Sequence, residues 1–260
     1  MEKLKKARRG PFVRERLTLP VRHADSLEPS TDSLSNRVYQ ALKRDIVTGV
    51  FPQGEALTEK DLAARYKSSR TPVREAAVRL QQDHLVRVVP NRGYFITKIS
   101  VQDLTELYDY RAAVECACAD LAAAMCVPKD AQGRLESLAH KEYKISDRES
   151  YESFISADTA FHVGIAQLSR NRLLLRAVES VRCQMERIMY AAIDIGYYGE
   201  LPGREHRGIL AAILARDPGT ARRLMYEHIF GSREKVMRLA GNTRYYQIEW
   251  KRTDPRGGTS

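Results

Sequence analysis

Two short helical patterns lie between Thr58 and Leu85, separated by the polar tripeptide Lys67-Ser68-Ser69. The second pattern begins with Thr71, which can cap a helix, and Pro72, which suits a first helical turn. Apolar residues then recur at the spacing of one helix face, namely Val73, Ala76, Ala77 and Leu80. The segment therefore predicts two helices joined by a tight turn.

Two runs rich in β-forming residues follow the second helical pattern. They cover Leu85 to Val89 and Tyr94 to Thr97, on either side of a turn sequence at residues 90–93. Such runs around a turn that contains proline, asparagine and glycine predict a β-hairpin. Together with an amphipathic helix that Ser33 caps, the pattern indicates a winged helix-turn-helix of three helices and a hairpin wing, a fold that binds double-stranded DNA.

Polar residues of this segment fall where such a domain contacts DNA. Arg70, Thr71 and Arg74 fan out beside the apolar stripe at the N-terminal end of the second helix, the end that approaches base edges and phosphates. Arg92 and Gly93 form a wing tip that can enter a narrow minor groove. The alternative is a small helical domain whose arginines only solvate a surface.

The basic charge of the chain is concentrated towards its N-terminus. Residues 1–100 carry 20 Lys and Arg against 11 Asp and Glu, whereas residues 101–260 carry 23 against 22. This excess is the electrostatic signature expected of phosphate binding. Residues 1–32 are basic and interrupted by prolines, which predicts a flexible arm that either follows the DNA backbone or is simply solvated.

The remainder of the chain is typical of helices with mostly short connections. The candidate helices are 101–126, 129–145, 148–169, 171–194, 203–215 and 218–239. Ser100 is the predicted cap of the first, with Asp103 in its first turn. The predicted fold is therefore mainly α, with the winged helix-turn-helix at residues 33–98 and an all-α antiparallel bundle at residues 99–240. Residues 241–260 are expected to be a loosely ordered tail.

Neither a cysteine-based zinc site nor a membrane span is predicted. The four cysteines lack paired CxxC spacing and lie in apolar helical patterns, so buried thiols and a reducing cytoplasm are expected: Cys116, Cys118, Cys126 and Cys183. No stretch approaches the roughly 18 uninterrupted apolar residues of a membrane span. The N-terminus lacks the apolar core of a secretory signal.

One aspartate and three histidines share apolar faces of the predicted bundle. Asp158 and His162 are four residues apart on one helix, so their side chains project from the same face. His206 and His228 lie on the apolar stripes of the last two helices. A divalent cation bound by these four residues would offset the cost of burying the carboxylate. Core histidines with ordinary hydrogen bonds, one of them paired with the aspartate, are the alternative.

The DNA-binding pattern resembles the N-terminal domain of the GntR family of bacterial transcription regulators. The similarity covers about residues 34–97 and rests on three motifs: Glu59 to Ala63, Ser69 to Ala76 and Asn91 to Phe95. The resemblance implies DNA contacts at six positions: Lys60, Ser69, Arg70, Thr71, Arg74 and Gly93. Lys67 and His84 stand where this family usually has glycine, and a left-handed backbone is expected at both.

Residues 101–240 resemble the metal-containing ligand-binding domain, or FCD domain, of the FadR-like branch of that family. The matching residues are Arg111 and Glu115, the run Asp158 to His162, Asn171, Glu205, His206 and His228. The resemblance implies that the aspartate and the three histidines bind a divalent metal, commonly zinc or nickel, which holds a small carboxylate effector. Nitrogen-rich ligation also suits such metals better than magnesium or calcium.

Arg111 is a second candidate for binding the carboxylate effector, because a guanidinium can form a bidentate pair with it. A salt bridge to Glu115, four residues further on, is the other role open to Arg111. Asn171 belongs to the expected effector site through the resemblance.

Together these patterns predict a cytoplasmic transcription regulator without enzymatic activity. We expect a repressor that binds a palindromic operator as a homodimer and responds to a small organic acid. Two other classes remain open: a metalloenzyme with a nucleic-acid-targeting domain, and an architectural DNA-binding protein whose histidines are structural. The sequence contains no helical His-x3-His beside a glutamate that would favour the enzyme.

Overall fold

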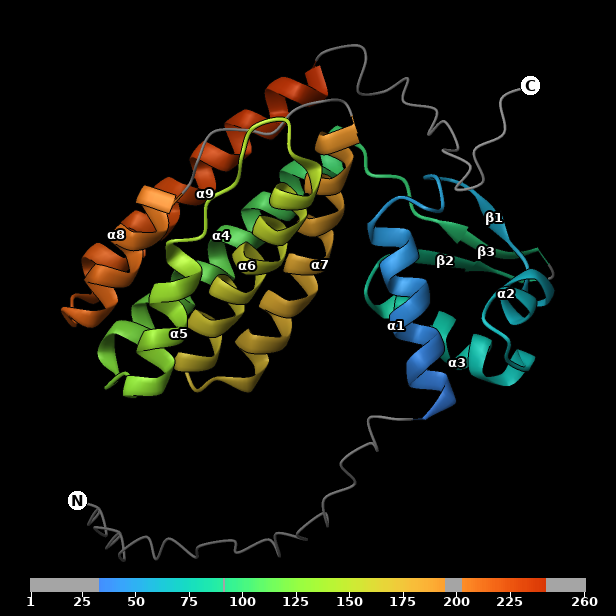
Figure 1. The fold of residues 1–260 in the computed structure, drawn as a ribbon, viewed down its shortest axis with the longest axis horizontal. Coiled ribbons are helices and arrows are strands. Elements are labelled where there is room, and N and C mark those ends of the chain that lie inside the picture. The colour runs from blue at the N-terminus through green and yellow to red at the C-terminus, as the bar shows by residue number, and fades with distance from the viewer. Residues whose placement is uncertain (1–32, 91, 195–202, 242–260) are drawn as a thin grey trace, which may run out of the picture. The chain divides into compact units, whose positions relative to one another are not determined.

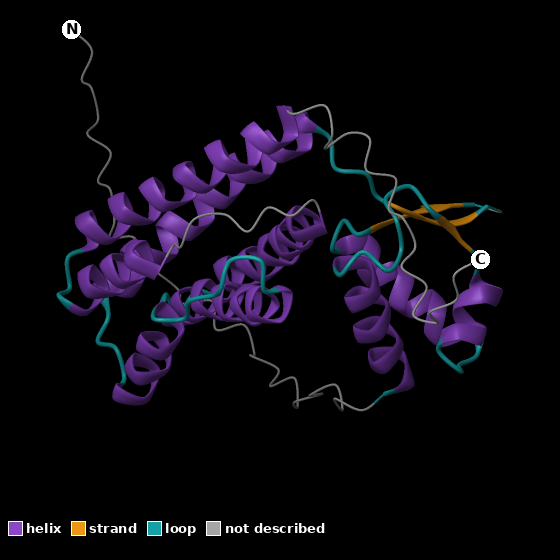
Figure 2. Cartoon of the chain, turned by 45° about the horizontal axis from the view of Figure 1, so that its top comes forward, coloured by secondary structure: helices purple, strands orange, loops and turns teal. Residues whose placement is uncertain are grey.

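The computed structural model describes residues 33–90, 92–194 and 203–241 of the chain (Figure 1). The predicted basic arm at 1–32 and all but the first residue of the predicted tail lie outside these ranges. Figure 2 shows strands only in the N-terminal part of the described chain and helices through the rest. The predicted fold class, mainly α with a small sheet in the first domain, is confirmed.

The N-terminal part contains three helices and a three-stranded sheet. The elements are α1 (Leu34–Val47), β1 (Ala56–Leu57), α2 (Glu59–Arg65), α3 (Arg70–Gln82), β2 (Val86–Val89) and β3 (Gly93–Ile96). The strands run antiparallel in the order β1-β3-β2, so the predicted hairpin is confirmed. Strand β1 was not predicted, because its two residues are too short to show an alternating pattern.

The apolar stripe of α3 forms the centre of this domain. Its predicted members are at most 1% exposed and pack with α1: Val73, Ala76, Ala77 and Leu80. Two residues beside helix ends have positive φ, Lys67 at 49° and His84 at 58°, which confirms the left-handed backbone expected at both. The turn between α2 and α3 therefore keeps the left-handed geometry without glycine.

The predicted cap of α3 at Thr71 is wrong. The helix begins at Arg70, and Ser69 is the N-cap residue in extended conformation, without a side-chain cap hydrogen bond. Pro72 is then the third helical residue instead of the first. The first turn leaves its N–H groups without helical partners, so proline is tolerated anywhere in it, and the helix can begin two residues earlier.

The C-terminal part is a bundle of helices around α4. Its elements are α4 (Val101–Ala124), α5 (Lys129–Ala139), α6 (Arg148–Leu168), α7 (Arg172–Asp194), α8 (Gly203–Leu214) and α9 (Pro218–Gly241). Helix α4 contacts α6, α7, α8 and α9, which makes it the central helix of the bundle (Figure 1). Ser100 and Asp103 form the predicted capping box at its start.

Helix α5 ends six residues before the predicted boundary at 145. Tyr143 lies in the connection that follows and packs its ring on two residues of α6, Tyr151 at 4.6 Å and Phe154 at 5.0 Å between ring centroids. Such aromatic contacts stabilise the chain outside a helix. The chain beyond Ala139 thus brings the Tyr143 ring against α6 from outside the helix.

The described cysteines are free thiols, three of them buried and Cys126 exposed. Burial was therefore predicted correctly for Cys116, Cys118 and Cys183 but not for Cys126. None of the helices in the described ranges is long and apolar enough to cross a membrane.

Candidate metal centre and DNA-binding surface

The predicted DNA-contacting residues of the first domain lie on its surface. Ser69, Arg70, Thr71 and Arg74 are exposed at the N-terminal end of α3, and Lys60 is exposed on α2. Arg92 is exposed in the turn between β2 and β3, where its N–H donates to the Val89 carbonyl at 3.0 Å. These residues form the polar surface that the sequence predicts.

Arg74 is held in place by an ion pair. Its Nε donates to Glu59 Oε1 at 2.7 Å, and the Tyr94 hydroxyl donates to the same oxygen at 3.1 Å. The hydrogen bond from Arg74 lowers the pKa of Glu59. The Arg74 side chain remains 62% exposed, so its guanidinium stays accessible to DNA.

Gly93 has a structural reason to be glycine. Its φ is +94°, and an added Cβ would lie 2.5 Å from the carbonyl oxygen of Leu57 on β1. Any other residue would push β1 away from β3. The structure thus gives Gly93 a role in the sheet, and a contact of its backbone with DNA stays a prediction.

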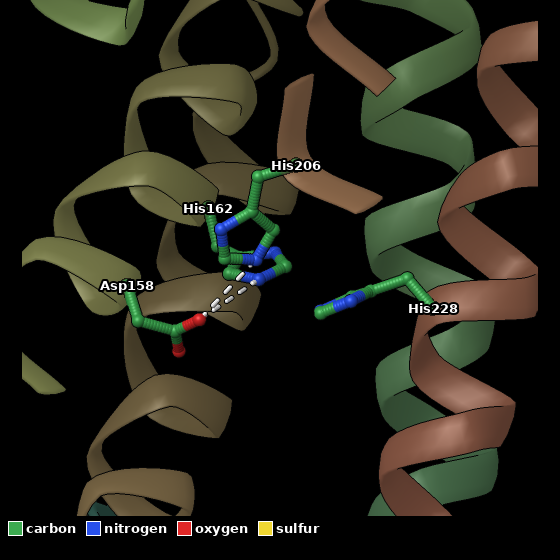
Figure 3. Close-up of side chains that lie close together, drawn as sticks. All are labelled: Asp158, His162, His206 and His228. Carbon is green, nitrogen blue, oxygen red and sulfur yellow. Dashed lines mark ion pairs between the residues drawn. The ribbon is translucent and has the colours of Figure 1, made fainter. Parts of the chain in front are cut away.

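Four potential metal ligands converge in the bundle, as predicted. Asp158 and His162 come from α6, His206 from α8 and His228 from α9, and all four are buried. Figure 3 shows their side chains directed towards one another, with Asp158 paired to two of the histidines. One ligand atom from each lies within 4.8 Å of the others.

Carboxylates outside the cluster orient two of the imidazoles. Glu115 Oε2 lies 2.7 Å from His162 Nδ1, and Glu205 Oε2 lies 2.7 Å from His228 Nδ1. If each Nδ1 carries the proton, it lies against its carboxylate, and the lone pair of each Nε2 is directed into the cluster. Such carboxylate and histidine pairs fix the tautomer of metal-binding imidazoles in proteins.

The third imidazole is positioned by packing. The His206 ring stacks on Phe161 with centroids 4.5 Å apart. Its Nε2 is buried without a hydrogen-bond partner among the described residues, although Asp158 Oδ1 lies 3.3 Å away. A buried nitrogen without a partner is costly, so its lone pair is available to a cation.

Two buried arginines accompany the cluster. Arg111 on α4 is 1% exposed, and its Nε donates to Glu115 Oε1 at 2.9 Å. Its Nη2 lies 3.4 Å from His162 Nε2 and 3.5 Å from His228 Nε2. Arg111 therefore forms the salt bridge to Glu115, one of the two roles left open by the sequence, and its binding of an effector stays a prediction.

Arg182 on α7 was not predicted. It is 1% exposed, and its Nη2 donates to Asp158 Oδ2. The sequence could have indicated this residue, because an arginine stands within the apolar stripe of Val178, Val181 and Met185. A cation buried in this way needs a buried partner of opposite charge. The remaining oxygen of Asp158 faces the histidines.

The electrostatics favour the neutral form of His162 and His206 and the ionised form of Asp158 and Glu115. Burial lowers the pKa of His162 to about 4 and that of His206 well below its ordinary value. Burial alone would raise the pKa of Asp158, but Arg182 and the histidines outweigh it and hold the pKa below its usual range. Burial likewise opposes ionisation of Glu115, yet Arg111 and His162 lower its pKa. Neutral imidazole and ionised carboxylate are the forms that bind metals.

The donor set fits a divalent transition metal. Zinc with bonds of roughly 2.1 Å spans ligand atoms up to about 4 Å apart, so these side chains need only a small inward shift. Three imidazoles and a carboxylate suit zinc or nickel better than magnesium or calcium. The cluster can hold a metal ion.

The structure does not bring Asn171 to the cluster. Its side chain is exposed at the start of α7, where Oδ1 accepts hydrogen bonds from the N–H groups of Leu173 at 3.0 Å and Leu174 at 3.2 Å. Asn171 therefore caps α7, a role for which asparagine is well suited. It does not line the cavity beside the cluster.

The cavity beside the cluster has a volume of about 90 Å³. Asp158, His228, Arg111 and Arg182 are among its lining residues, so it borders the cluster. A small anion in the cavity would therefore meet two guanidinium groups and the metal ligands together.

Comparison with known proteins assigns both parts of the chain. Residues 34–96 match the bacterial regulatory proteins of the gntR family, and residues 106–231 match the FCD domain. The HTH-type transcriptional repressor RspR of Escherichia coli K12 is 30% identical, and the match covers 80% of this chain and 91% of RspR. The chain belongs to the GntR family.

Further relatives agree with this assignment. The Uxu operon regulator of Haemophilus influenzae is 28% identical over 83% of this chain and 88% of its own length. The fold is that of E. coli McbR/YncC, with a TM-score of 0.65 at 21% identity over 80% of this chain and 99% of that one. This GntR-family protein is a DNA-binding transcription regulator with an FCD domain.

Proposed function

We propose that this GntR-family protein is a repressor that binds a palindromic operator in double-stranded DNA as a homodimer. Binding of a small carboxylic acid at a metal ion in the FCD domain releases the operator. The observation that supports this most directly is the cluster of Asp158 and three histidines beside two buried arginines. A cavity lined by arginines and bordered by metal ligands is suited to binding an organic anion.

The proposed functions are assigned to the domains within their predicted boundaries. Residues 33–98 bind DNA, residues 99–240 bind the metal and the acid, and no role is assigned to 1–32 or 241–260. The protein acts in the cytoplasm, where bacterial DNA is located. Asp158, His162, His206 and His228 hold zinc or nickel, with Glu115 and Glu205 orienting the imidazoles. Arg111 and Arg182 attract the carboxylate, and Asn171 is left out because its side chain caps α7.

A divalent ion held by these residues would supply positive charge to the effector site. The role of the chain is to orient the imidazoles, bury the carboxylates and exclude bulk water. A relative with a stated role, RspR, is a transcriptional repressor, which favours a regulator over the metalloenzyme alternative.

Metal analysis separates this proposal from a protein with structural histidines. Protein purified without chelator and dialysed against metal-free buffer is expected to retain one divalent transition metal per chain by elemental mass spectrometry. The His206→Ala variant is expected to lose it. A wild-type chain that stays metal-free after incubation with zinc and nickel would show that the histidines are structural.

Replacing Arg74 by alanine is expected to weaken operator binding roughly 5- to 150-fold, the range for a bidentate base contact, and to relax specificity at one base pair. Arg74→Lys is the matched control, because it keeps the charge but not the bidentate geometry. Mobility shifts with the operator and with single-base variants measure both effects. Unchanged specific binding by Arg74→Ala would remove Arg74 from the recognition surface.

Dimerisation is expected because one recognition helix contacts only a few base pairs. A two-fold dimer places two copies of α3 on half-sites about one helical turn apart, which matches a palindromic operator. Sedimentation analysis at micromolar concentration should give twice the mass of one chain, both free and on operator DNA. A monomeric mass under both conditions would contradict the prediction.

A further inference from the structure

The cavity beside the cluster has both charged and apolar side chains in its lining. Its aromatic, thioether and aliphatic lining residues, here called the wall, are Tyr143, Tyr151, Phe154, Met185, Ile188 and Met189. Tyr143, Tyr151 and Phe154 pack their rings on one another, which fixes this wall. The cavity surface is mostly apolar.

Polar groups of the lining already have partners. Glu205 accepts from His228 Nδ1 at 2.7 Å, and Ser232 is hydrogen-bonded to the Tyr108 hydroxyl at 3.0 Å. Lys235 lines the same cavity and adds a positive charge, which suits an anion. A ligand with several hydroxyl groups along its body would have to bury some of them against the apolar side chains of the lining.

We infer that the acid recognised at this site has an apolar body, and that the aromatic and methionine wall selects against polyhydroxylated sugar acids. The inference rests on the proposed effector site and names the class of its ligand. The carboxylate lies towards Arg111, Arg182 and the metal ligands, and the hydrocarbon part lies against Phe154 and Met189. The apolar part of the lining disfavours hydroxyls, because a hydroxyl loses its water without gaining a partner against Phe154, Ile188 or Met189.

The cavity volume limits the size of that body. At about 90 Å³ the cavity is smaller than the roughly 150 Å³ apolar cavity that accommodates benzene in a protein core. The comparison favours a short acid of about four carbons over a six-carbon sugar acid.

Two acids of equal chain length test the inference. 2-Hydroxybutyrate and 2,3,4-trihydroxybutyrate, with the same configuration at carbon 2, present the same hydroxy-carboxylate head and differ only by hydroxyls on the body. Isothermal titration of the zinc-loaded full-length protein is expected to show at least about tenfold tighter binding of 2-hydroxybutyrate. Equal or tighter binding of the trihydroxy acid would overturn the inference.

A substitution in the wall provides the second test. Met189→Gln keeps the side-chain length and introduces an amide that can form hydrogen bonds with hydroxyls. The ratio of the affinity for 2-hydroxybutyrate to that for the trihydroxy acid should therefore fall at least about threefold. Met237→Gln is the matched control, because Met237 is a partly buried residue of α9 that does not line the cavity. Thermal melting establishes that both variants are folded. An unchanged preference in a folded Met189→Gln protein would show that the acid body lies elsewhere.

The outcomes distinguish this inference from the proposed function. If the trihydroxy acid binds as tightly as 2-hydroxybutyrate and does so only with zinc present, the effector site stands and the apolar selection fails. If neither acid binds and zinc has no effect in either titration, the effector site and the inference fail together.

Discussion

Chelation of the metal is expected to lower the melting temperature of the wild-type protein by roughly 10 °C. A ligand that binds only the folded chain stabilises it by about 4 kcal/mol when its free concentration is 1,000 times the dissociation constant. For a chain of this size each kcal/mol changes the melting temperature by about 2–4 °C. The effect is large because Asp158, His206 and His228 lie on different helices, which the ion links together.

The His206→Ala and His228→Ala variants should show little response to chelator and should melt near the temperature of the chelated wild type. His140→Ala is the matched control, since His140 is exposed on the surface and its side-chain Nδ1 donates to the Glu136 carbonyl in the same helical turn. Calorimetric melts with and without EDTA measure all four proteins. Equal chelator sensitivity of His206→Ala and wild type would place the metal elsewhere.

Binding of an acid effector is expected to change operator affinity by roughly 5- to 150-fold, a coupling of about 1–3 kcal/mol. The physical link is covalent and short: β3 ends at Ile96 and α4 begins at Val101. Ile99 N–H donates to Gln53 Oε1 at 3.0 Å, and the capping box fixes Ser100, so the connection has little slack. Arg111 lies on the same helix, and a shift of α4 towards an acid would be passed to the hairpin.

Linkage makes this prediction testable from either ligand. The affinity of the protein for 2-hydroxybutyrate is titrated with and without operator. The ratio of these two affinities must equal the factor by which the acid changes operator affinity. The expected sign is weaker binding in the presence of operator. The His206→Ala protein serves as control, because without metal the acid should leave its operator affinity unchanged. Identical acid affinity in both titrations of the wild type would refute the coupling, even if the metal ligands are correct.

Features that depend on local pattern were predictable from the sequence. The α3 stripe, the Ser100 and Asp103 capping box and the inward faces of the cluster follow from helical periodicity, since residues four apart share a face. Helical periodicity also placed His206 and His228 on apolar stripes, although their meeting in space depends on tertiary packing. The metal cluster was thus predictable in composition but not in geometry.

Features that depend on tertiary partners were not predictable in this way. Arg182 is an arginine in an apolar stripe, and only the position of Asp158 across the helix pair explains its burial. Asn171 was assigned by resemblance to the effector site, whereas its local capping of α7 decides its position. The start of α3 and the end of α5 both come earlier than predicted. At helix ends several local conformations have similar energies, and tertiary packing decides which one forms.

The two buried ion pairs, Arg111 with Glu115 and Arg182 with Asp158, make the core of the site electrically neutral before a metal arrives. A divalent ion therefore brings two uncompensated charges into a region without bulk water, and an anion must accompany it. The apparent affinity for zinc or nickel should then depend on the buffer anion and be higher in acetate than in a bulky sulfonate buffer. Metal titrations of this protein consequently report the ion together with its counter-ion.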